Sequence, residues 1–275
     1  MSLVRNRKPH LRLDVDWPGE DVLQKLIQRA SGLFVWASTM SEFINGHDPR
    51  RRLDVVLNEK AGSSAEGALD ALYKTALDAI NLWDDEDFVA DFRAILGVVL
   101  VACKPLSSST IDALLHLPNE RPSMHTISLL GCVLRRGPSV RVLHPSFADF
   151  LTVEQRCGRD VWFFDRSIYH RHLAFRCLDR TDATLERNMC CMTLSLDQTN
   201  ESLSEDVSYS CLYWVDHIST LRDDLIPVMD RLRVFLYSHF LHWFEAMSIL
   251  KKTRDTIPLL NRPTNRILVS HSESF

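Results

Sequence analysis

The stretch Val140–Leu151, with the sequence VRVLHPSFADFL, passes directly from a short extended run into an amphipathic helix. Val140, Val142 and His144 alternate with their neighbours, and a Gly-Pro turn precedes them, so a brief hairpin strand is expected. After the proline, apolar side chains recur at helical spacing at Phe147, Phe150 and Leu151. A strand feeding a helix places His144 beside free backbone N–H groups, in a position suited to meeting a phosphate.

The start of this helix also carries small polar residues. Ser146 is expected to be the N-cap, with Asp149 three residues later in a variant of the capping box. His144, Ser146 and Asp149 offer the residue types of a hydrolytic triad, but Ser146 is better explained as a cap. No G-x-S-x-G elbow occurs in the chain. We therefore expect no catalytic residues and a protein that is not an enzyme.

The elements before this stretch suggest a domain type. Helices are expected over 88–103, from Pro105 to Leu117 and over Ser123–Leu134, followed by the hairpin and the capped helix. Three helices and a wing are the order of a winged-helix domain, which reads DNA or packs against other modules. The candidate recognition helix, 124–134, contains no Arg, Lys, Asn or Gln, which makes it a poor face for reading bases.

A nucleic-acid-binding role is nevertheless kept as the alternative. It would use the arginines around the hairpin, Arg135, Arg136 and Arg141. The net charge of −4 gives no overall basic field, and the second basic cluster, 50–52, has the composition of solvated surface. Binding to nucleic acid is therefore expected to be unlikely on charge grounds.

The rest of the chain is predicted to be helical. Before the winged helix, we expect a helix or helix pair over 21–44 that is weakest at Ser31-Gly32, helices over 51–57 and 69–82, a flexible linker over 61–67, and an acidic helix start at 84–87. After residue 156 we expect helices near 161–179, 185–194, 207–219, 227–235 and 236–250, and a frayed tail over 261–275. The aromatic side chains of this region are expected to be core anchors, or alternatively to form in part a docking face for neighbouring domains. The segments are 1–60 (helical arm), 61–155 (linker, connecting helix and winged helix) and 156–275 (C-terminal helical domain).

Composition describes an ordinary globular protein. The 275 residues are 45% hydrophobic and 25% charged, enough for a substantial core in one or two domains. Seven cysteines without a CxxC pair fit a reducing cytosol, and the adjacent pair Cys190-Cys191 is most simply buried thiol. No apolar run reaches the roughly 18 to 20 residues that cross a bilayer, and the N-terminus lacks a signal core. We expect a cytoplasmic protein without a membrane partner.

Metal and nucleotide motifs are incomplete. The pairs His170/His172 and His239/His242 lack a third ligand at matching spacing, so no metal is expected. Gly62 and Gly67 have the spacing of a P-loop, but Ala68-Leu69 follow where Lys and Ser or Thr are required. The acidic run 84–87 follows no hydrophobic strand, which a Walker B motif requires. We therefore expect no cofactor and no autonomous NTP hydrolysis.

Several ordered blocks of the sequence resemble a known family. They are ASGLFVWAST (30–39), LDALYKTAL (69–77), FRAILGVVLVACKPLSSSTIDALL (92–115), VRVLHPSFADFL (140–151) and HWFEAMSIL (242–250). Together they look like fungal NACHT-type STAND ATPases, in the region that follows the nucleotide-binding core. The resemblance covers roughly residues 11–260. It implies a helical arm, a winged helix with a short β-hairpin wing, and a second helical region.

The resemblance also implies a role for one residue. In NACHT proteins the His of the winged-helix pattern contacts the phosphate of bound ADP and helps to hold the resting state closed, and His144 matches that position. Alternatively, His144 caps the wing and packs on the following helix. We expect a mainly α, non-catalytic regulatory fragment that lacks the P-loop and the sensor repeats. Its partner would be a NACHT-type nucleotide-binding core or a paralogue, with His144 reaching ADP only when such a core is present in trans or upstream.

Overall fold

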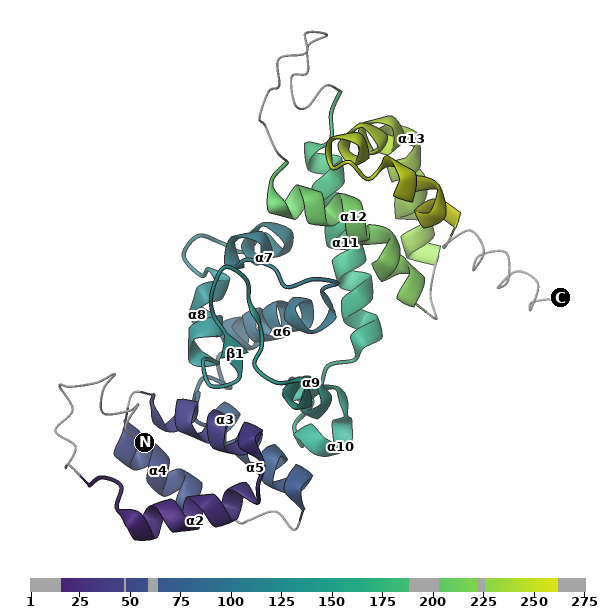
Figure 1. The fold of residues 1–275 in the computed structure, drawn as a ribbon. Helices are drawn as coiled ribbons and strands as arrows, with labels where there is room; N and C mark the ends of the chain where they lie inside the picture. The colour runs from purple at the N-terminus through teal and green to yellow at the C-terminus, as the bar shows by residue number, and fades with distance from the viewer. Residues whose placement is uncertain (1–15, 47, 59–63, 188–202, 222–225, 262–275) are drawn as a thin grey trace. The chain divides into compact units, whose positions relative to one another are not determined.

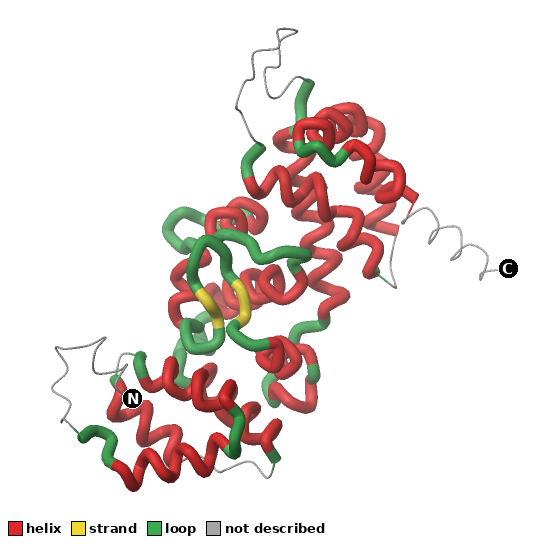
Figure 2. The backbone as a smooth tube through the Cα atoms, viewed as in Figure 1, coloured by secondary structure: helices red, strands yellow, loops and turns green. Residues whose placement is uncertain are grey.

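The computed structural model describes residues 16–46, 48–58, 64–187, 203–221 and 226–261, and these residues are mainly helical (Figures 1 and 2). The helices are α2 (Glu20–Ala30), α3 (Phe34–Ile44), α4 (Pro49–Asn58), α5 (Ala65–Asp78), α6 (Glu86–Val101), α7 (Ser108–Leu115), α8 (Ser123–Leu129), α9 (Pro145–Thr152), α10 (Glu154–Cys157), α11 (Arg166–Thr184), α12 (Glu205–Thr220) and α13 (Ile226–Ile249), with a 3-10 turn, η1 (Asp160–Trp162). Residues 253–261 are also helical. The mainly α class expected from the sequence is confirmed.

Among the described residues, β-strands form one antiparallel pair, and Leu106 and Val140 each take part only in an isolated β-bridge. Strand β1 (Leu134–Arg135) pairs with β2 (Arg141–Val142), so that Leu134 lies opposite Val142 and Arg135 opposite Arg141. The hairpin expected after the Gly-Pro turn is therefore present, although each strand has only two residues. Whether this hairpin is the wing of a winged helix stays a prediction.

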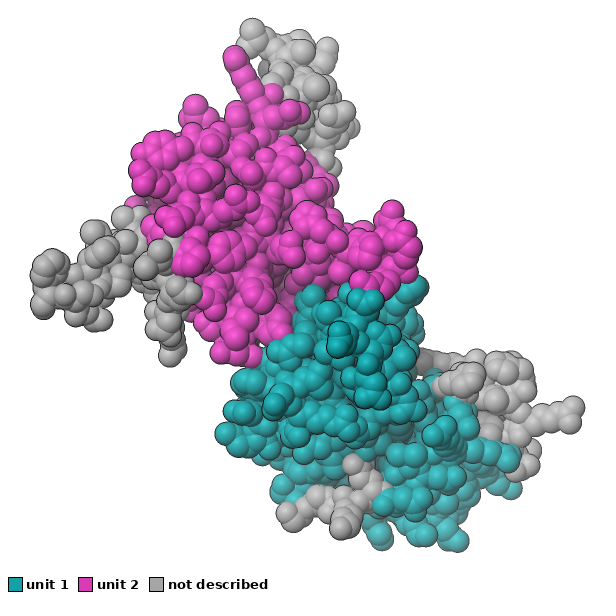
Figure 3. Space-filling view, turned by 180° about the vertical axis from the view of Figure 1, so that it is seen from behind, with its two compact units in different colours: residues 1–94, 124–164 teal, residues 95–123, 165–275 magenta. Residues whose placement is uncertain are grey.

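The chain divides into two compact units (Figure 3). Unit 1 comprises Met1–Ala94 and Met124–Phe164, and unit 2 comprises Ile95–Ser123 and Asp165–Phe275. This division groups residues by their contacts and does not test the three segments expected from the sequence. Those segments, 1–60, 61–155 and 156–275, stay a prediction.

Unit 1 begins with a helix pair whose break the sequence identifies. Ser31 adopts the left-handed conformation that ends α2, and Gly32 follows with a φ of 78°. Helix α3 contacts α2, α4 and α5, and its side chains Phe43 and Ile44 are almost fully buried. A chain reversal at Ser31-Gly32 thus lets two short amphipathic helices share one core.

An aromatic cluster forms a second part of the core of unit 1. The Trp83 ring forms T-shaped pairs with the rings of Phe88, Phe92 and Trp162, at centroid distances of 5.0 to 5.5 Å. The Trp83 indole also donates a hydrogen bond to the Leu77 carbonyl. Because edge-to-face pairs are favourable for aromatic rings, this cluster fixes α6 against the segment that follows α10.

Two expectations for unit 1 are corrected by the structure. Residues 64–67 are not a linker, because Ser64 accepts a hydrogen bond from Gly67 N and caps α5, which begins four residues before the expected start at 69. Residues 61–63 lie outside the described residues. The helix expected over Ser123–Leu134 ends at Leu129 because the chain turns and Leu134 enters the hairpin. A seven-residue α8 leaves little length for a recognition helix.

Unit 2 is built around α11 and α12, which pack along each other and against α7 and α13. Trp214 and Trp243 are fully buried, with ring centroids 5.9 Å apart and their planes nearly perpendicular. The Trp243 indole donates to the Cys211 carbonyl. Most of the aromatic residues expected to anchor the C-terminal region are indeed core residues.

Two expectations for unit 2 are also revised. The helices expected over 227–235 and 236–250 form the single helix α13, because the sequence between them contains no breaker. Of the helix expected over 185–194, Leu185 is buried but not helical. The rest of that segment, the Cys190-Cys191 pair and the tail beyond residue 261 lie outside the described residues. In the described part of the chain, no helix is both long and apolar enough to cross a membrane.

Candidate functional site

His144, the residue selected from the sequence, is the N-cap of α9. Its backbone is extended (φ −144°, ψ 140°), and its Nδ1 accepts a hydrogen bond of 3.2 Å from the Ser146 backbone N–H. The expectation that Ser146 would be the cap, with Asp149 completing a capping box, is wrong. Pro145 occupies the first helical position, and a residue before proline is held in the extended region that a cap requires. The cap is therefore His144.

Ser146 has a different role, because its hydroxyl joins His144 to a buried tyrosine. Ser146 Oγ lies 2.8 Å from His144 Nδ1 and 2.7 Å from the hydroxyl of Tyr73 on α5. Tyr73 is 1% exposed, and its ring packs on Phe147 and Phe150. Burial raises the pKa of Tyr73, so the phenol keeps its proton and can donate to Ser146. Tyr73 was not singled out from the sequence as a site residue.

These contacts determine which nitrogen of neutral His144 carries the proton. Nδ1 accepts the backbone N–H of Ser146, so it presents a lone pair. Ser146 Oγ lies within hydrogen-bond distance of both the Tyr73 hydroxyl and the same Nδ1, and either hydroxyl of the Tyr73–Ser146 pair can be the donor. The proton of the neutral ring is therefore on Nε2. Because the His144 side chain is exposed, Nε2–H is the donor that this ring offers to a ligand.

A second connection fixes α10 to α5 near the Tyr73 contact. The Arg156 guanidinium donates to both carboxylate oxygens of Asp70 at 2.7 to 3.2 Å, and it lies 2.8 Å from Glu66 Oε1. The hydrogen bond that Arg156 donates to Asp70 raises the pKa of Arg156. Helix α5 therefore contacts α9 through Tyr73 and α10 through Asp70, which holds the His144 cap on a rigid base.

The arginines considered for nucleic-acid binding surround the hairpin. Arg135 and Arg141 are exposed and lie directly opposite each other across β1 and β2. Arg136 donates a long hydrogen bond, 3.4 Å, to Ser128 Oγ on α8. Like charges that face each other across strands disfavour the pairing unless an anion binds them.

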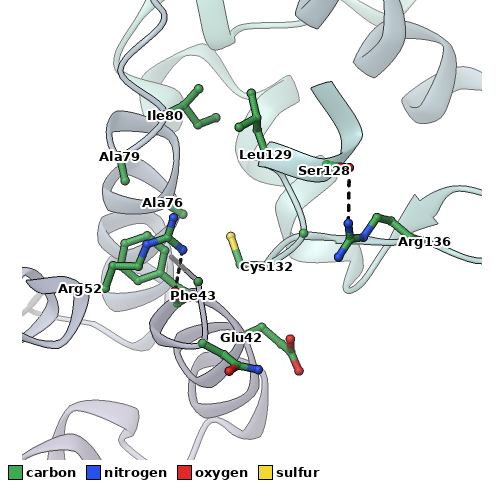
Figure 4. A pocket seen from close by; sticks show the side chains of 13 residues that line it. Glu42, Phe43, Arg52, Ala76, Ala79, Ile80, Ser128, Leu129, Cys132 and Arg136 are labelled. Carbon is green, nitrogen blue, oxygen red and sulfur yellow. Dashed lines mark hydrogen bonds between the residues drawn. The ribbon is translucent and has the colours of Figure 1, made fainter. Parts of the chain in front are cut away.

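A cavity in unit 1 adjoins Arg136 (Figure 4). It has a volume of about 380 Å³, and its lining includes Glu42, Arg52 and Cys132. Arg52 is already engaged, since it donates to the Phe43 carbonyl and its guanidinium lies over the Phe43 ring. Burial raises the pKa of Cys132 to about 11, which leaves the thiol protonated and a poor nucleophile. The volume suits a small molecule, but nothing in the lining indicates a reaction.

Unit 2 holds a chain of buried polar groups that the sequence did not reveal. The Tyr209 hydroxyl accepts from Cys103 N at 3.1 Å and lies 2.8 Å from His217 Nε2. His217 Nδ1 lies 2.9 Å from His170 Nδ1. The donor and acceptor roles along this chain depend on the tautomers of His217 and His170. Desolvation lowers the pKa of His217 to about 3 and also lowers that of His170, so both rings are neutral.

The histidine pairs examined as metal ligands have other contacts. His170 belongs to the chain with His217, and His239 Nε2 lies 3.0 Å from Asp182. The Nδ1 atoms of His239 and His242 are 3.5 Å apart. Within the described ranges, no group of three or more His, Cys, Asp or Glu side chains is placed to hold a metal ion.

Comparison with known proteins gives one informative similarity. The chain is 23% identical over 283 aligned positions to the vegetative incompatibility protein HET-E-1 of Podospora anserina. The alignment covers 91% of this chain and 20% of HET-E-1, so the chain spans about a fifth of that protein's length. No family model matches the chain. No solved structure matches it either.

Proposed function

We propose that this chain is a non-catalytic regulatory module related to one region of NACHT-type signalling ATPases. The similarity to HET-E-1 extends over nearly the whole chain, at an identity that indicates a distant relationship. The module would act in the cytoplasm by binding a NACHT-type nucleotide-binding core. The observation that carries this proposal is the fixed Nε2–H of exposed His144.

The proposed chemistry is a hydrogen bond from His144 to a phosphate of ADP held by the core. The Ser146 backbone N–H donates to Nδ1, which leaves Nε2 to carry the proton of the neutral ring and to donate to a nucleotide. The positive end of α9 favours an anion nearby. A fixed donor loses little entropy on binding, and a hydrogen bond to a charged group is worth about 1.5–3 kcal/mol.

The proposed consequence is control of a resting state. A contact made only when ADP is bound stabilises the complex of module and core in that nucleotide state. The module itself would hydrolyse nothing, and its effect would be on the conformation of its partner. The winged-helix character expected from the sequence is part of this proposal.

Co-purification tests this function. The whole chain is mixed with a P-loop-containing core of a NACHT-type protein, with and without ADP. We expect a complex that forms more fully with ADP, and His144→Ala is expected to lose only the ADP-dependent part. Absence of any association, or equal loss with and without ADP, would contradict the proposal.

The alternative function is nucleic-acid binding through the hairpin, and the facing pair Arg135 and Arg141 is the observation that favours it. A duplex shift measured at increasing salt separates the two functions, because phosphate contacts weaken steeply with salt. Salt-dependent binding that the double substitution Arg135→Ala, Arg141→Ala abolishes would support this alternative. Lack of binding at low salt would exclude it.

A further inference from the structure

Helix α13 in unit 2 has two apolar faces, and the described residues of the chain cover only one of them. Leu232, Phe235, Trp243 and Met247 are at most 4% exposed and form part of the core. On the opposite face, Val234 is 50% exposed, Tyr237 82%, Leu241 76% and Phe244 44%. We name these four exposed residues the outer stripe. A helix that is apolar on both faces is expected to be buried on both, so the outer stripe needs a partner.

The spacing of the outer stripe is that of a coiled-coil seam. Its members are separated by three, four and three residues, which places Val234 and Leu241 at a positions and Tyr237 and Phe244 at d positions. The pattern continues at both ends with exposed polar residues, Asp230 and Ser248. A sustained 3-4 repeat on the exposed face indicates that the missing partner is another helix.

The stripe is complementary to itself when two copies of α13 run antiparallel. With a twofold axis at position 239, Val234 faces Phe244 and Tyr237 faces Leu241 of the second copy. Each layer then joins one a position to one d position and one larger side chain to one smaller side chain. Such alternation fills the space between helices evenly.

Charge also favours the antiparallel arrangement. Asp230 is exposed near the N-terminal end of α13, and Lys251 is exposed just beyond its C-terminal end. In an antiparallel pair, Asp230 of one copy lies opposite Ser248 of the other and one layer from its Lys251. A parallel pair would instead bring Asp230 next to Asp230 and Lys251 next to Lys251, which is unfavourable.

We propose that the outer stripe is the interface through which two copies of this chain form an antiparallel dimer. The seam is one helix long, which is small compared with the roughly 1,200–2,000 Å² of a standard stable interface. The dimer is therefore expected to dissociate on dilution through the micromolar range. The proposal is independent of any nucleotide contact by His144.

Sedimentation equilibrium of the whole chain over a dilution series tests the proposal. We expect a mass that rises from one copy to two with concentration. Leu241→Glu should raise the dissociation constant by about tenfold or more, because it puts a charge in the seam. Phe34→Glu is the matched control, since Phe34 is 85% exposed but lies on α3 in unit 1, and it should leave the dimer unchanged.

A monomer at every concentration would overturn the proposal. It would also be overturned by a dimer that Leu241→Glu leaves intact, or by one that Phe34→Glu weakens equally.

Disulfide cross-linking tests the orientation of the two helices. A mixture of Val234→Cys chains and Phe244→Cys chains should form the 234–244 disulfide, identified by peptide mapping against the parent protein. Val234→Cys chains alone should not cross-link at position 234, because the two copies of that residue lie several turns apart in the antiparallel pair. A 234–234 disulfide would show a parallel pair and contradict the proposed register.

Discussion

The Tyr73 hydroxyl lies 2.7 Å from Ser146 Oγ, although the two residues are 73 positions apart in the sequence. This contact connects the core of unit 1 to the exposed His144 imidazole through a single serine. A buried phenol that keeps its proton therefore helps to decide which proton a surface histidine offers. The sequence contains all three residues, but only the packing of α5 on α9 brings Tyr73 to Ser146.

Removal of the Tyr73 hydroxyl should lower the stability of the fold and reduce the population of the His144 tautomer that is protonated at Nε2. Tyr73→Phe keeps the aromatic packing and deletes one hydrogen bond, so the free energy of unfolding should fall by about 0.5–1.5 kcal/mol. Nitrogen-15 NMR of labelled histidine should show a larger population of His144 protonated at Nδ1. An unchanged nitrogen spectrum would mean that Tyr73 does not influence the tautomer.

Two substitutions of His144 separate its role as the N-cap of α9 from its role as a hydrogen-bond donor to a ligand. His144→Ala removes the cap of α9 and should cost about 1 kcal/mol of stability in urea unfolding. His144→Asn should retain most of that stability, because asparagine is among the best N-cap residues. If both variants unfold at the same urea concentration as the parent, the Nδ1 cap contributes nothing to stability.

The two carboxylates that contact Arg156 should differ in importance. The Asp70 side chain is 15% exposed and makes the two-oxygen contact, whereas that of Glu66 is 67% exposed. Asp70→Asn should therefore destabilise unit 1 by about 1–3 kcal/mol, since it weakens a charged hydrogen bond away from water. Glu66→Gln, the matched control, should cost less than about 0.5 kcal/mol because exposed ion pairs contribute little. Equal effects in thermal unfolding would contradict this ranking.

The stability of the protein should fall on mild acidification. The folded-state pKa of His217, about 3, and that of His170 both lie below the unfolded value near 6.5. The unfolded chain therefore binds more protons below pH 6.5, and the free energy of unfolding decreases as pH falls from 6.5 towards 5. Each such histidine contributes a slope of up to about 1.4 kcal/mol per pH unit.

Urea unfolding at several pH values measures how the free energy of unfolding depends on pH. A variant at His217 shows whether this residue causes the dependence. His217→Asn should be less stable at neutral pH but should show a shallower dependence between pH 6.5 and 5. The acidic groups Glu205 and Asp206 have lowered pKa values, so their effect lies at lower pH. The same slope in the parent and the variant would show that His217 does not cause the acid sensitivity.

The sequence predicted most helices because their signals are local. Ser31-Gly32 marks a helix break, and the acidic run ending at Asp87 does start α6, where Asp85 accepts from Phe88 N. The cap of α9 was misassigned to Ser146 even though Pro145 contained the decisive signal. A residue before proline is kept extended, so the correct cap could have been predicted from the pair His144-Pro145.

The parts that the sequence could not predict depend on contacts between distant residues. No periodicity indicates that Tyr73 reaches Ser146, that Arg156 binds Asp70, or that His217 is buried against Tyr209. Of the outer stripe of α13, only Phe244 was marked from the sequence, among the aromatic residues expected as core anchors or as a docking face. A helix that is apolar on two faces needs the fold to show which face is covered.

The affinity of the whole chain for an ADP-loaded NACHT-type core, compared between the parent and His144→Asn by calorimetry, tests the central claim most directly. The asparagine keeps the cap, and its amide N–H donor lies closer to the backbone than Nε2, so folding is preserved while the phosphate contact is weakened. We expect the parent to bind about tenfold or more tightly than the variant with ADP, and equally well without it. Equal affinities of the two proteins for the ADP-loaded core would contradict the proposed role of His144.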